Sequence, residues 1–251
     1  MAAWQHLRDE LARWQERGQI ATFWWRDDDA TRASPELVRL LNLSVEQEVA
    51  VALAVIPRDV DSSLHALLPD YPRAAVLQHG WSHENHAPDD ERQEEHGPHR
   101  PQAVMAQELA EGWRRIAALP RALPVLVAPW NRVDSDLLPT LPSIGLGGVS
   151  TLGPRDAAEP VPGVRRTNVH IDVMDWHGTG GFVGDDNAID QALSHLASRR
   201  TEAADPAEPT GLMTHHLFHD EGCWRFIEEF LSHTRSHPAV KWLGAREAFW
   251  P

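Results

Sequence analysis

The sequence has few of the features that mark disulfide-bonded, membrane-spanning or nucleic-acid-binding proteins. It contains one cysteine, Cys223, among 251 residues, which excludes an internal disulfide and favours a reducing compartment. Positively charged residues do not cluster, because the three RR pairs are isolated and the net charge is −14. Polyanion binding depends on clustered Lys and Arg, so we expect no nucleic-acid or anionic-membrane partner.

The N-terminal segment, MAAWQHLRDELARWQERG, has no apolar core and is dense in charge. It is therefore expected to be neither a signal peptide nor a membrane span. Trp4, Leu7, Leu11 and Trp14 recur at helical spacing and predict an amphipathic helix that ends at Gly18. We expect a cytoplasmic protein without a membrane span.

Apolar runs of strand length alternate with helix-like segments along almost the whole chain. The predicted strands are 20–26, 49–56, 74–78, 125–129, 147–151, 167–173 and 211–215, with a short last run, VKWL. The predicted helices are 35–48, 60–68, 102–119, 133–141, 187–200 and 222–235, and the predicted loops include 161–166 and 201–210. Strands separated by helices indicate a parallel sheet. We predict one α/β domain over 1–251, a distorted (β/α) barrel of seven or eight parallel strands, with a doubly wound open sheet as the alternative.

Polar motifs follow the predicted strand ends. RDDD follows the first strand, HGWSH the third, PWNR the fourth, DVMDW the sixth and THHLFHD the seventh. In a parallel barrel all strand C-termini lie on one face, where active sites are found. We therefore expect these motifs to meet at one mouth.

Two of these motifs contain residues that suit a metal ion. His79 and His83 are four positions apart, so on one helical turn both imidazoles would lie on the same face and suit an ion such as Zn²⁺. An aspartate of RDDD (26–29) is a candidate third ligand, and a His₂-carboxylate set leaves positions open for water and substrate. The simpler alternatives are a chance H-xxx-H pair among fifteen histidines and an acidic turn that caps a helix.

The motif after the seventh predicted strand, THHLFHD, contains histidines that could act as an acid. His215 and His216 would point to opposite faces of a continuing strand, so only one should reach the mouth. There it could protonate a leaving group. A buried histidine that bonds only to the backbone is the alternative.

In this order, over about residues 20–220, the motifs resemble those of the polysaccharide deacetylase superfamily, carbohydrate esterase family 4. The similarity is greatest to a cytoplasmic subgroup with RxDD, QHGxxH and PWNR. Members of the superfamily are (β/α) barrels that hydrolyse N- or O-acetyl groups on sugars with a divalent metal. The resemblance implies that Asp28 is the general base, that Asp29, His79 and His83 are metal ligands, and that His215 is the general acid.

Other roles follow from the same resemblance. It implies that Asp175 tunes the acid histidine, with Asp172 as the alternative, and RDDD can also be aligned one residue earlier, at 27–28. The residues that would contact the substrate are Trp81, Trp130, Asn131, Arg132 and Trp176.

The chain departs from the family pattern at one position. The third motif usually opens with an arginine that orients the base, and here that position is Val127. Arg26 and Arg132 are the candidates to replace it.

The sequence thus predicts a metal-dependent hydrolase, with Zn²⁺ as the expected ion, that removes an acetyl group from a sugar or glycan precursor. The alternatives are a barrel metallohydrolase that acts on a non-sugar amide and a degenerate member that binds metal or sugar without turnover. The acidic stretch HENHAPDDERQEEHGPH (83–99) is expected to be a solvated lid over the mouth.

Overall fold

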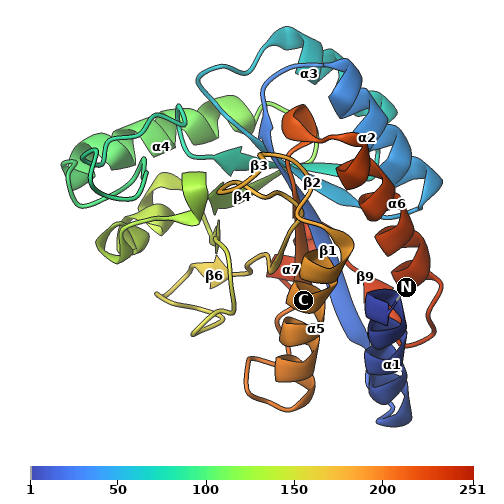
Figure 1. The fold of residues 1–251 in the computed structure, drawn as a ribbon. Coiled ribbons are helices and arrows are strands. Elements are labelled where there is room, and N and C mark those ends of the chain that lie inside the picture. The colour runs from blue at the N-terminus through green and yellow to red at the C-terminus, as the bar shows by residue number, and fades with distance from the viewer. Residues whose placement is uncertain (1) are drawn as a thin grey trace.

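The computed structural model describes residues 2–251 and shows a curled parallel sheet surrounded by helices (Figure 1). The order across the sheet is β6 (Arg165–Arg166), β5 (Gly148–Ser150), β4 (Ala122–Val127), β3 (Ala74–His79), β2 (Val51–Val55), β1 (Ala21–Ala30), β8 (Thr210–Thr214) and β7 (Ile171–Asp172). A ninth strand, β9 (Val240–Trp242), pairs with the beginning of β1. The predicted distorted (β/α) barrel is confirmed.

One chain segment joins the two ends of this strand order. The Thr167 and Val169 amides donate to the β5 side, at Val149 O and Thr151 O, over 3.2 and 3.0 Å. The next amide, that of His170, donates to Gly211 O of β8 over 2.8 Å. Residues 165–172 therefore behave as one irregular strand that closes the barrel. The predicted strand 167–173 corresponds to this segment, whereas the loop predicted over 161–166 is wrong at Arg165 and Arg166, which form β6.

Seven α-helices occur in the described chain. They are α1 (Ala2–Glu16), α2 (Pro35–Glu46), α3 (Ser62–Leu67), α4 (Gln102–Ile116), α5 (Asp185–Arg200), α6 (Glu221–Arg235) and α7 (Ala245–Phe249). Four 3₁₀ segments accompany them: η1 (Leu68–Asp70), η2 (Pro129–Asn131), η3 (Ser135–Ile144) and η4 (His216–Phe218). The predicted α-helix at 133–141 is replaced by η3, because Pro139 and Pro142 lack the amide protons that an α-helix needs. Over residues 2–251, no helix combines the length and apolarity needed to cross a membrane.

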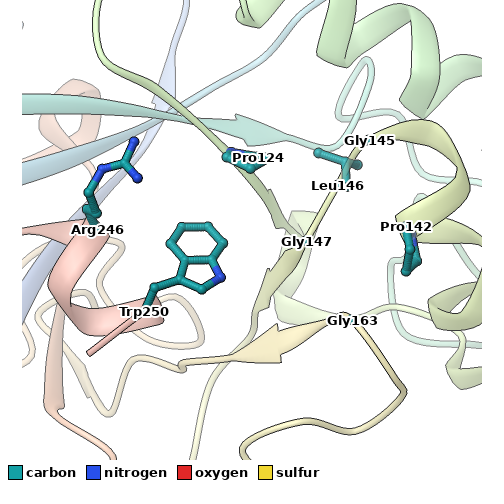
Figure 2. A pocket seen from close by; sticks show the side chains of 8 residues that line it. All are labelled: Pro124, Pro142, Gly145, Leu146, Gly147, Gly163, Arg246 and Trp250. Carbon is teal, nitrogen blue, oxygen red and sulfur yellow. The ribbon is translucent and has the colours of Figure 1, made fainter.

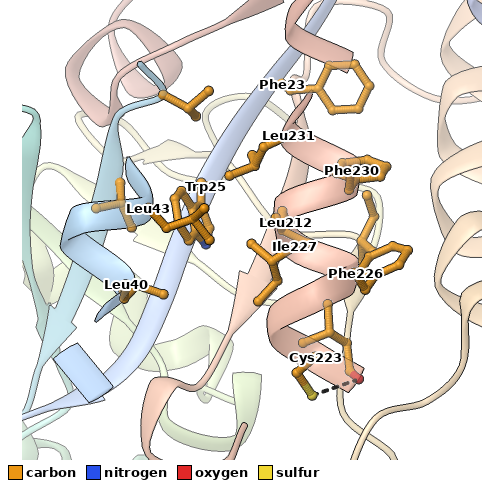
Figure 3. Packing of buried hydrophobic residues seen from close by; sticks show 14 of the residues in the cluster. Phe23, Trp25, Leu40, Leu43, Leu212, Cys223, Phe226, Ile227, Phe230 and Leu231 are labelled. Atoms are coloured by element: carbon orange, nitrogen blue, oxygen red, sulfur yellow. Dashed lines mark hydrogen bonds between the residues drawn. The ribbon is translucent and has the colours of Figure 1, made fainter. Parts of the chain in front are cut away.

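Alternation along β1 divides the core into two layers. Phe23 and Trp25 belong to the outer cluster, where Phe23 meets Phe230 of α6 edge to face at 6.0 Å and Trp25 lies on the side of Leu40 and Leu43 of α2 (Figure 3). Trp24 instead faces the barrel interior and packs with Val125. Because side chains two apart share a face of a strand, Arg26 and Asp28 continue the interior face above Trp24. The first strand thus directs an arginine and a carboxylate into the barrel mouth.

A cleft of about 490 Å³ lies beside the beginnings of β4 and β5 (Figure 2). It is lined by Pro124, Pro142, Gly145, Leu146, Gly147, Gly163, Arg246 and Trp250. Arg246 is the one charged residue among them, so this cleft offers no acid–base pair. The chemistry-bearing side chains gather at the other ends of the strands.

Candidate active site

The three consecutive aspartates of β1 have different environments. Asp27 is fully buried and accepts bonds from Thr214 Oγ1 at 2.6 Å and from the His216 amide at 3.1 Å. Its carboxylate also pairs with the His216 ring. Asp28, on the opposite face of the strand, lies at the mouth. Asp28 and Asp29 therefore reach the mouth, whereas Asp27 is buried on the other face of β1.

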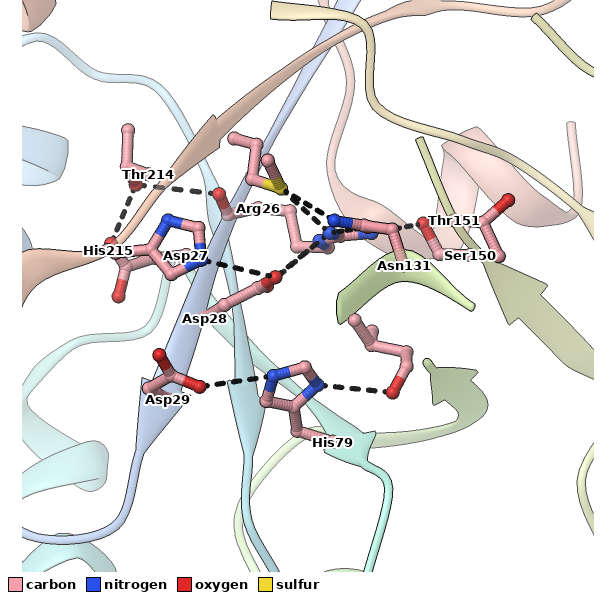
Figure 4. A network of polar contacts seen from close by, with 12 residues as sticks. Arg26, Asp27, Asp28, Asp29, His79, Asn131, Ser150, Thr151, Thr214 and His215 are labelled. Carbon is pink, nitrogen blue, oxygen red and sulfur yellow. Dashed lines mark hydrogen bonds and ion pairs between the residues drawn. The ribbon is translucent and has the colours of Figure 1, made fainter. Parts of the chain in front are cut away.

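A bulge allows Asp29 to reach the same mouth as Asp28. The pairing of β1 with β2 shifts between Asp27 and Ala30, and Asp29 has φ +71°, in the left-handed region. An extra residue in a strand re-aims the side chains beside it. Both carboxylates consequently lie above the end of the sheet (Figure 4).

The predicted metal ligands are close together. Asp29 Oδ1 lies 3.1 Å from His79 Nε2 and 3.5 Å from His83 Nε2. One ligand atom from each of the three residues lies within 4.8 Å of the others. The two histidines are not on a helical turn as expected: His79 ends β3, and the left-handed residues Gly80 (φ +53°) and His83 (φ +57°) reverse the chain between them.

Hydrogen bonds and charges prepare these residues for a cation. His79 Nδ1 lies 3.1 Å from Val127 O and can only donate to it, which leaves the lone pair of Nε2 for a metal. Asp29 Oδ1 is buried and faces the Nε2 atoms of both histidines. Burial alone would raise the pKa of Asp29, but His79 holds that pKa well below its usual range. The three side chains therefore fit a divalent ion.

The pKa values of the two histidines move in opposite directions. Burial lowers the pKa of His83, and the charge of His79 lowers it further, so the His83 ring is neutral near pH 7. Burial also acts against the charged form of His79, but the neighbouring carboxylates, Asp29 first and then Asp28, raise its pKa overall. A cation bound in place of the His79 proton would compensate the negative charge of the same two carboxylates.

Arg26 holds the carboxylate of Asp28. Its Nε lies 2.8 Å from Asp28 Oδ1 and its Nη2 donates to Asp28 Oδ2 over 2.9 Å, a bidentate pair with both side chains buried. The guanidinium also donates to Ser150 Oγ at 2.8 Å and to Asn131 Oδ1 at 2.6 Å. Of the two candidates to replace the missing motif arginine, Arg26 contacts the aspartate. Arg132 donates to Gln93 O at 2.9 Å, on the 83–99 stretch.

The PWNR motif forms a strained turn at the rim. Trp130 and Asn131 both have left-handed backbone conformations, with φ +51° and +57°. Such residues are uncommon outside glycine and gather at functional sites. The turn places the Trp130 ring 4.2 Å from the His83 ring and turns the Asn131 side chain toward Arg26.

His215 faces Asp28 across the mouth, with 3.9 Å between its Nε2 and Asp28 Oδ2. The Trp176 ring meets His215 edge to face at 4.8 Å and donates its indole N–H to Asp172 at 3.0 Å. Burial raises the pKa of the Asp172 carboxyl, and the nearby His215 ring opposes this rise. Asp175 accepts a bond from the Thr179 amide at 3.0 Å in its own turn. Of the two carboxylates considered for tuning His215, Asp172 is the one the structure places beside it.

Trp81 lies away from these groups. Its ring lies under the Arg115 guanidinium of α4, 4.8 Å from the ring centre. Among the expected substrate contacts, the structure thus brings Trp130, Asn131 and Trp176 to the mouth and directs Trp81 and Arg132 elsewhere.

A second group of possible ligands was missed by the sequence reasoning. His170, His195 and Glu208 are buried, and one ligand atom of each lies within 4.8 Å of the others. Both histidines also line an open cleft of about 640 Å³ along α5. The three residues are far apart in the sequence and share no motif, so spacing could not have identified them.

Comparison with known proteins assigns the fold. No model of a known protein family and no curated protein matches the sequence. Among solved structures, a protein assigned as a polysaccharide deacetylase from Mycobacterium smegmatis matches with a TM-score of 0.64 and 16% identity, covering 92% of this chain and 90% of that one. The chain has the polysaccharide deacetylase fold.

Two further structures with this fold are similar. A family 4 carbohydrate esterase from Streptomyces lividans, in complex with acetate, matches with a TM-score of 0.52 and 16% identity, covering 88% of this chain and 90% of that one. A mutant of a pseudoenzyme of the same family matches with a TM-score of 0.58 and 11% identity, covering 92% of this chain and 67% of that one. The polysaccharide deacetylase fold thus occurs in enzymes and in a pseudoenzyme, so the activity has to be argued from the site itself.

Proposed function

We propose that this protein is a metal-dependent hydrolase that removes an N- or O-acetyl group from a sugar or glycan precursor. The observation that supports this most strongly is the convergence of Asp29, His79 and His83 beside Asp28 and His215 at one mouth of the polysaccharide deacetylase fold. Two imidazoles, a carboxylate and a flanking acid–base pair are what metal-assisted hydrolysis requires.

The proposed metal ligands are Asp29, His79 and His83. Imidazole and carboxylate ligands suit Zn²⁺, which is the ion we propose. When bound there, the ion would supply Lewis-acid chemistry, polarising the acetyl carbonyl and making water more acidic.

Proton transfer is assigned to the two flanking residues. Asp28 accepts a proton from the water that adds to the carbonyl carbon, and Arg26 keeps its carboxylate oriented. His215 donates a proton to the amine or alcohol as the bond from the carbonyl carbon breaks. One water is consumed and acetate is released with the deacetylated sugar. Asp172, rather than Asp175, is the carboxylate proposed to tune His215.

The rim suits a sugar. Trp176 is 44% exposed and is held in place by its bond to Asp172, and Trp130 stands across the mouth against His83. Fixed aromatic rings offer a flat apolar surface with a polar tip, which matches the face of a pyranose. We propose that these two residues contact the sugar on either side of the scissile bond.

Acetate release measures this activity. We expect the zinc-loaded protein to release acetate from a member of a panel of N-acetylhexosamines and O-acetylated sugars, and Asp28→Asn to lose the activity while retaining zinc. Release only from a non-sugar amide would favour the other metallohydrolase. Bound metal without release from any compound would indicate a binding protein and contradict the proposal.

A further inference from the structure

The acidic stretch after His83 does not behave as the solvated lid expected from its composition. Glu95 and His96 are completely buried. The Asp134 amide donates to His96 O over 2.8 Å and fixes this part of the stretch to the body of the barrel. A fully buried carboxylate needs partners that compensate for its lost hydration.

The partners of Glu95 belong to the turn between the two proposed metal-ligating histidines. Glu95 Oε1 accepts the Ser82 amide at 2.6 Å and the Ser82 hydroxyl at 2.9 Å. Glu95 Oε2 accepts the Trp81 amide at 3.1 Å. One carboxylate therefore satisfies both backbone amides at the centre of the HGWSH motif, through charge-assisted bonds.

The turn is also packed tightly against this carboxylate. A Cβ atom at Gly80 would overlap Glu95 Oε2 and come within 2.5 Å of Pro129 Cγ. Gly80 has φ +53°, so glycine is required here both by conformation and by space. The chain from His79 to His83 therefore packs directly against the Glu95 carboxylate.

Glu95 is itself held from the side of α4. Arg100 Nη1 donates to Glu95 O over 3.2 Å, and Arg100 Nη2 pairs with Glu108 of α4 at 2.8 Å. The main chain of Glu95 is thus linked through Arg100 to α4, which fixes the position from which its carboxylate reaches the turn.

We propose that Glu95 is a positioning residue that sets the spacing and orientation of His79 and His83 by holding the amides of Trp81 and Ser82. This inference rests on the metal site of the proposed function. Residues that orient metal ligands typically change metal affinity by about 10–100-fold when they are replaced. Glu95 would affect metal affinity through the backbone of the turn between His79 and His83.

The chain provides matched controls. Glu10 of α1 is also a buried carboxylate with charge-assisted partners, accepting from Arg13 at 3.0 Å and from Arg200 at 2.6 Å, and it belongs to neither group of possible metal ligands. Glu91 lies in the same acidic stretch, is exposed, and contacts His99. Glu10→Gln therefore reproduces the loss of a buried, charged acceptor, and Glu91→Gln reproduces the loss of charge in the acidic stretch.

The test compares Zn²⁺ affinity, measured by competition with a chelator, with the free energy of unfolding in urea. We expect Glu95→Gln to weaken Zn²⁺ binding by about tenfold and Glu95→Ala by about 100-fold. The absorption spectrum of bound Co²⁺ should change in both variants, because the ligand geometry changes. Glu10→Gln should lose stability with Zn²⁺ affinity unchanged, and Glu91→Gln should change neither.

Hydrogen exchange gives a readout that needs no metal. The Trp81 and Ser82 amides should exchange faster in Glu95→Gln than in the wild type, with no such change in Glu10→Gln. Wild-type Zn²⁺ affinity and an unchanged Co²⁺ spectrum in Glu95→Gln would overturn this inference alone. A wild-type protein that binds neither Zn²⁺ nor Co²⁺ would overturn the proposed function together with it.

Discussion

At the scale of single residues, proton positions distinguish the two groups of possible metal ligands. His79 donates from Nδ1 to Val127 O, which leaves the lone pair of Nε2 free. In the second group, the Gly211 amide donates to His170 Nδ1 at 3.0 Å, so the proton of the neutral ring sits on Nε2. That nitrogen faces Glu208 as a donor. Only the first group presents all its ligand atoms as acceptors.

We therefore predict one Zn²⁺ per chain. His79→Gln should lose the ion, because it removes one of the three ligands, whereas His195→Gln should retain it. Metal content after dialysis measures both. Two ions in the wild-type protein, or loss of the ion in His195→Gln, would show that the second group binds metal.

Arg26 leads to a second prediction for single residues. Arg26→Lys keeps the charge but cannot form the bidentate pair with Asp28 while also holding Asn131. Losing one charge-assisted bond, about 1.5–3 kcal/mol, should lower kcat by about 10–100-fold, with zinc content unchanged. Steady-state kinetics of acetate release measures this.

Arg132→Lys is the matched control, because Arg132 donates to Gln93 O and has no bond to Asp28. Its kcat should equal that of the wild type. If Arg132→Lys lost activity and Arg26→Lys did not, the assignment of the orienting arginine would be wrong.

Whether the placement of a residue can be predicted from the sequence depends on where its partners lie in the chain. Arg26 and Asp28 are two apart on a strand, so alternation alone places them on one face. Glu95 carries no such signal, because its partners lie thirteen or fourteen residues earlier and its neighbours form an acidic stretch typical of solvent-exposed loops. Only the tertiary structure shows that it is buried.

At the scale of elements, regular strands and helices were predictable and local departures from regularity were not. The apolar run before HGWSH predicted β3, but the spacing of His79 and His83 suggested a helical turn where a left-handed turn occurs. The bulge at Asp29 likewise depends on pairing with β2, which one strand's sequence does not encode. The extent of the strand over 165–172 also depends on its neighbours, because the segment pairs with β5 at its start and with β8 at its end.

The turn between His79 and His83, the proposed metal-ligating histidines, yields a prediction about backbone strain. Gly80→Ala places a side chain at φ +53° and against Glu95 and Pro129. The conformational cost alone is about 1–3 kcal/mol. Because of the added overlap, the free energy of unfolding should fall by more than this. Gly18→Ala is the control, because Gly18 has φ +65° with open space around it. Urea unfolding measures both variants. Equal losses of stability would indicate that Glu95 and Pro129 do not crowd the turn.

At the scale of the whole molecule, several buried histidines make the fold sensitive to acid. Burial lowers the pKa values of His96, His195 and His219 to about 4, so these rings are neutral in the native state at pH 7. The unfolded chain, with histidine pKa values of about 6.5, binds more protons between pH 6.5 and 4. Stability is therefore fully present above pH 6.5 and is lost as the pH falls toward 4.

His96 provides the test of this acid sensitivity. Both of its ring nitrogens are buried without a hydrogen-bond partner among residues 2–251. His96→Gln removes one titrating group, so the slope of unfolding free energy against pH in this window should decrease by up to about 1.4 kcal/mol per pH unit. Urea unfolding at several pH values measures the slope. An unchanged slope would mean that His96 has the same pKa in the folded and the unfolded protein.

The barrel as a whole brings the motifs together, and this convergence is the central claim. Anomalous diffraction at the zinc edge, from crystals of the zinc-loaded protein, locates the ion directly. We predict one strong peak at about 2.0–2.2 Å from Asp29, His79 Nε2 and His83 Nε2, with Asp28 and His215 beside it. A peak at His170, His195 and Glu208, or no peak at the barrel mouth, would contradict this account.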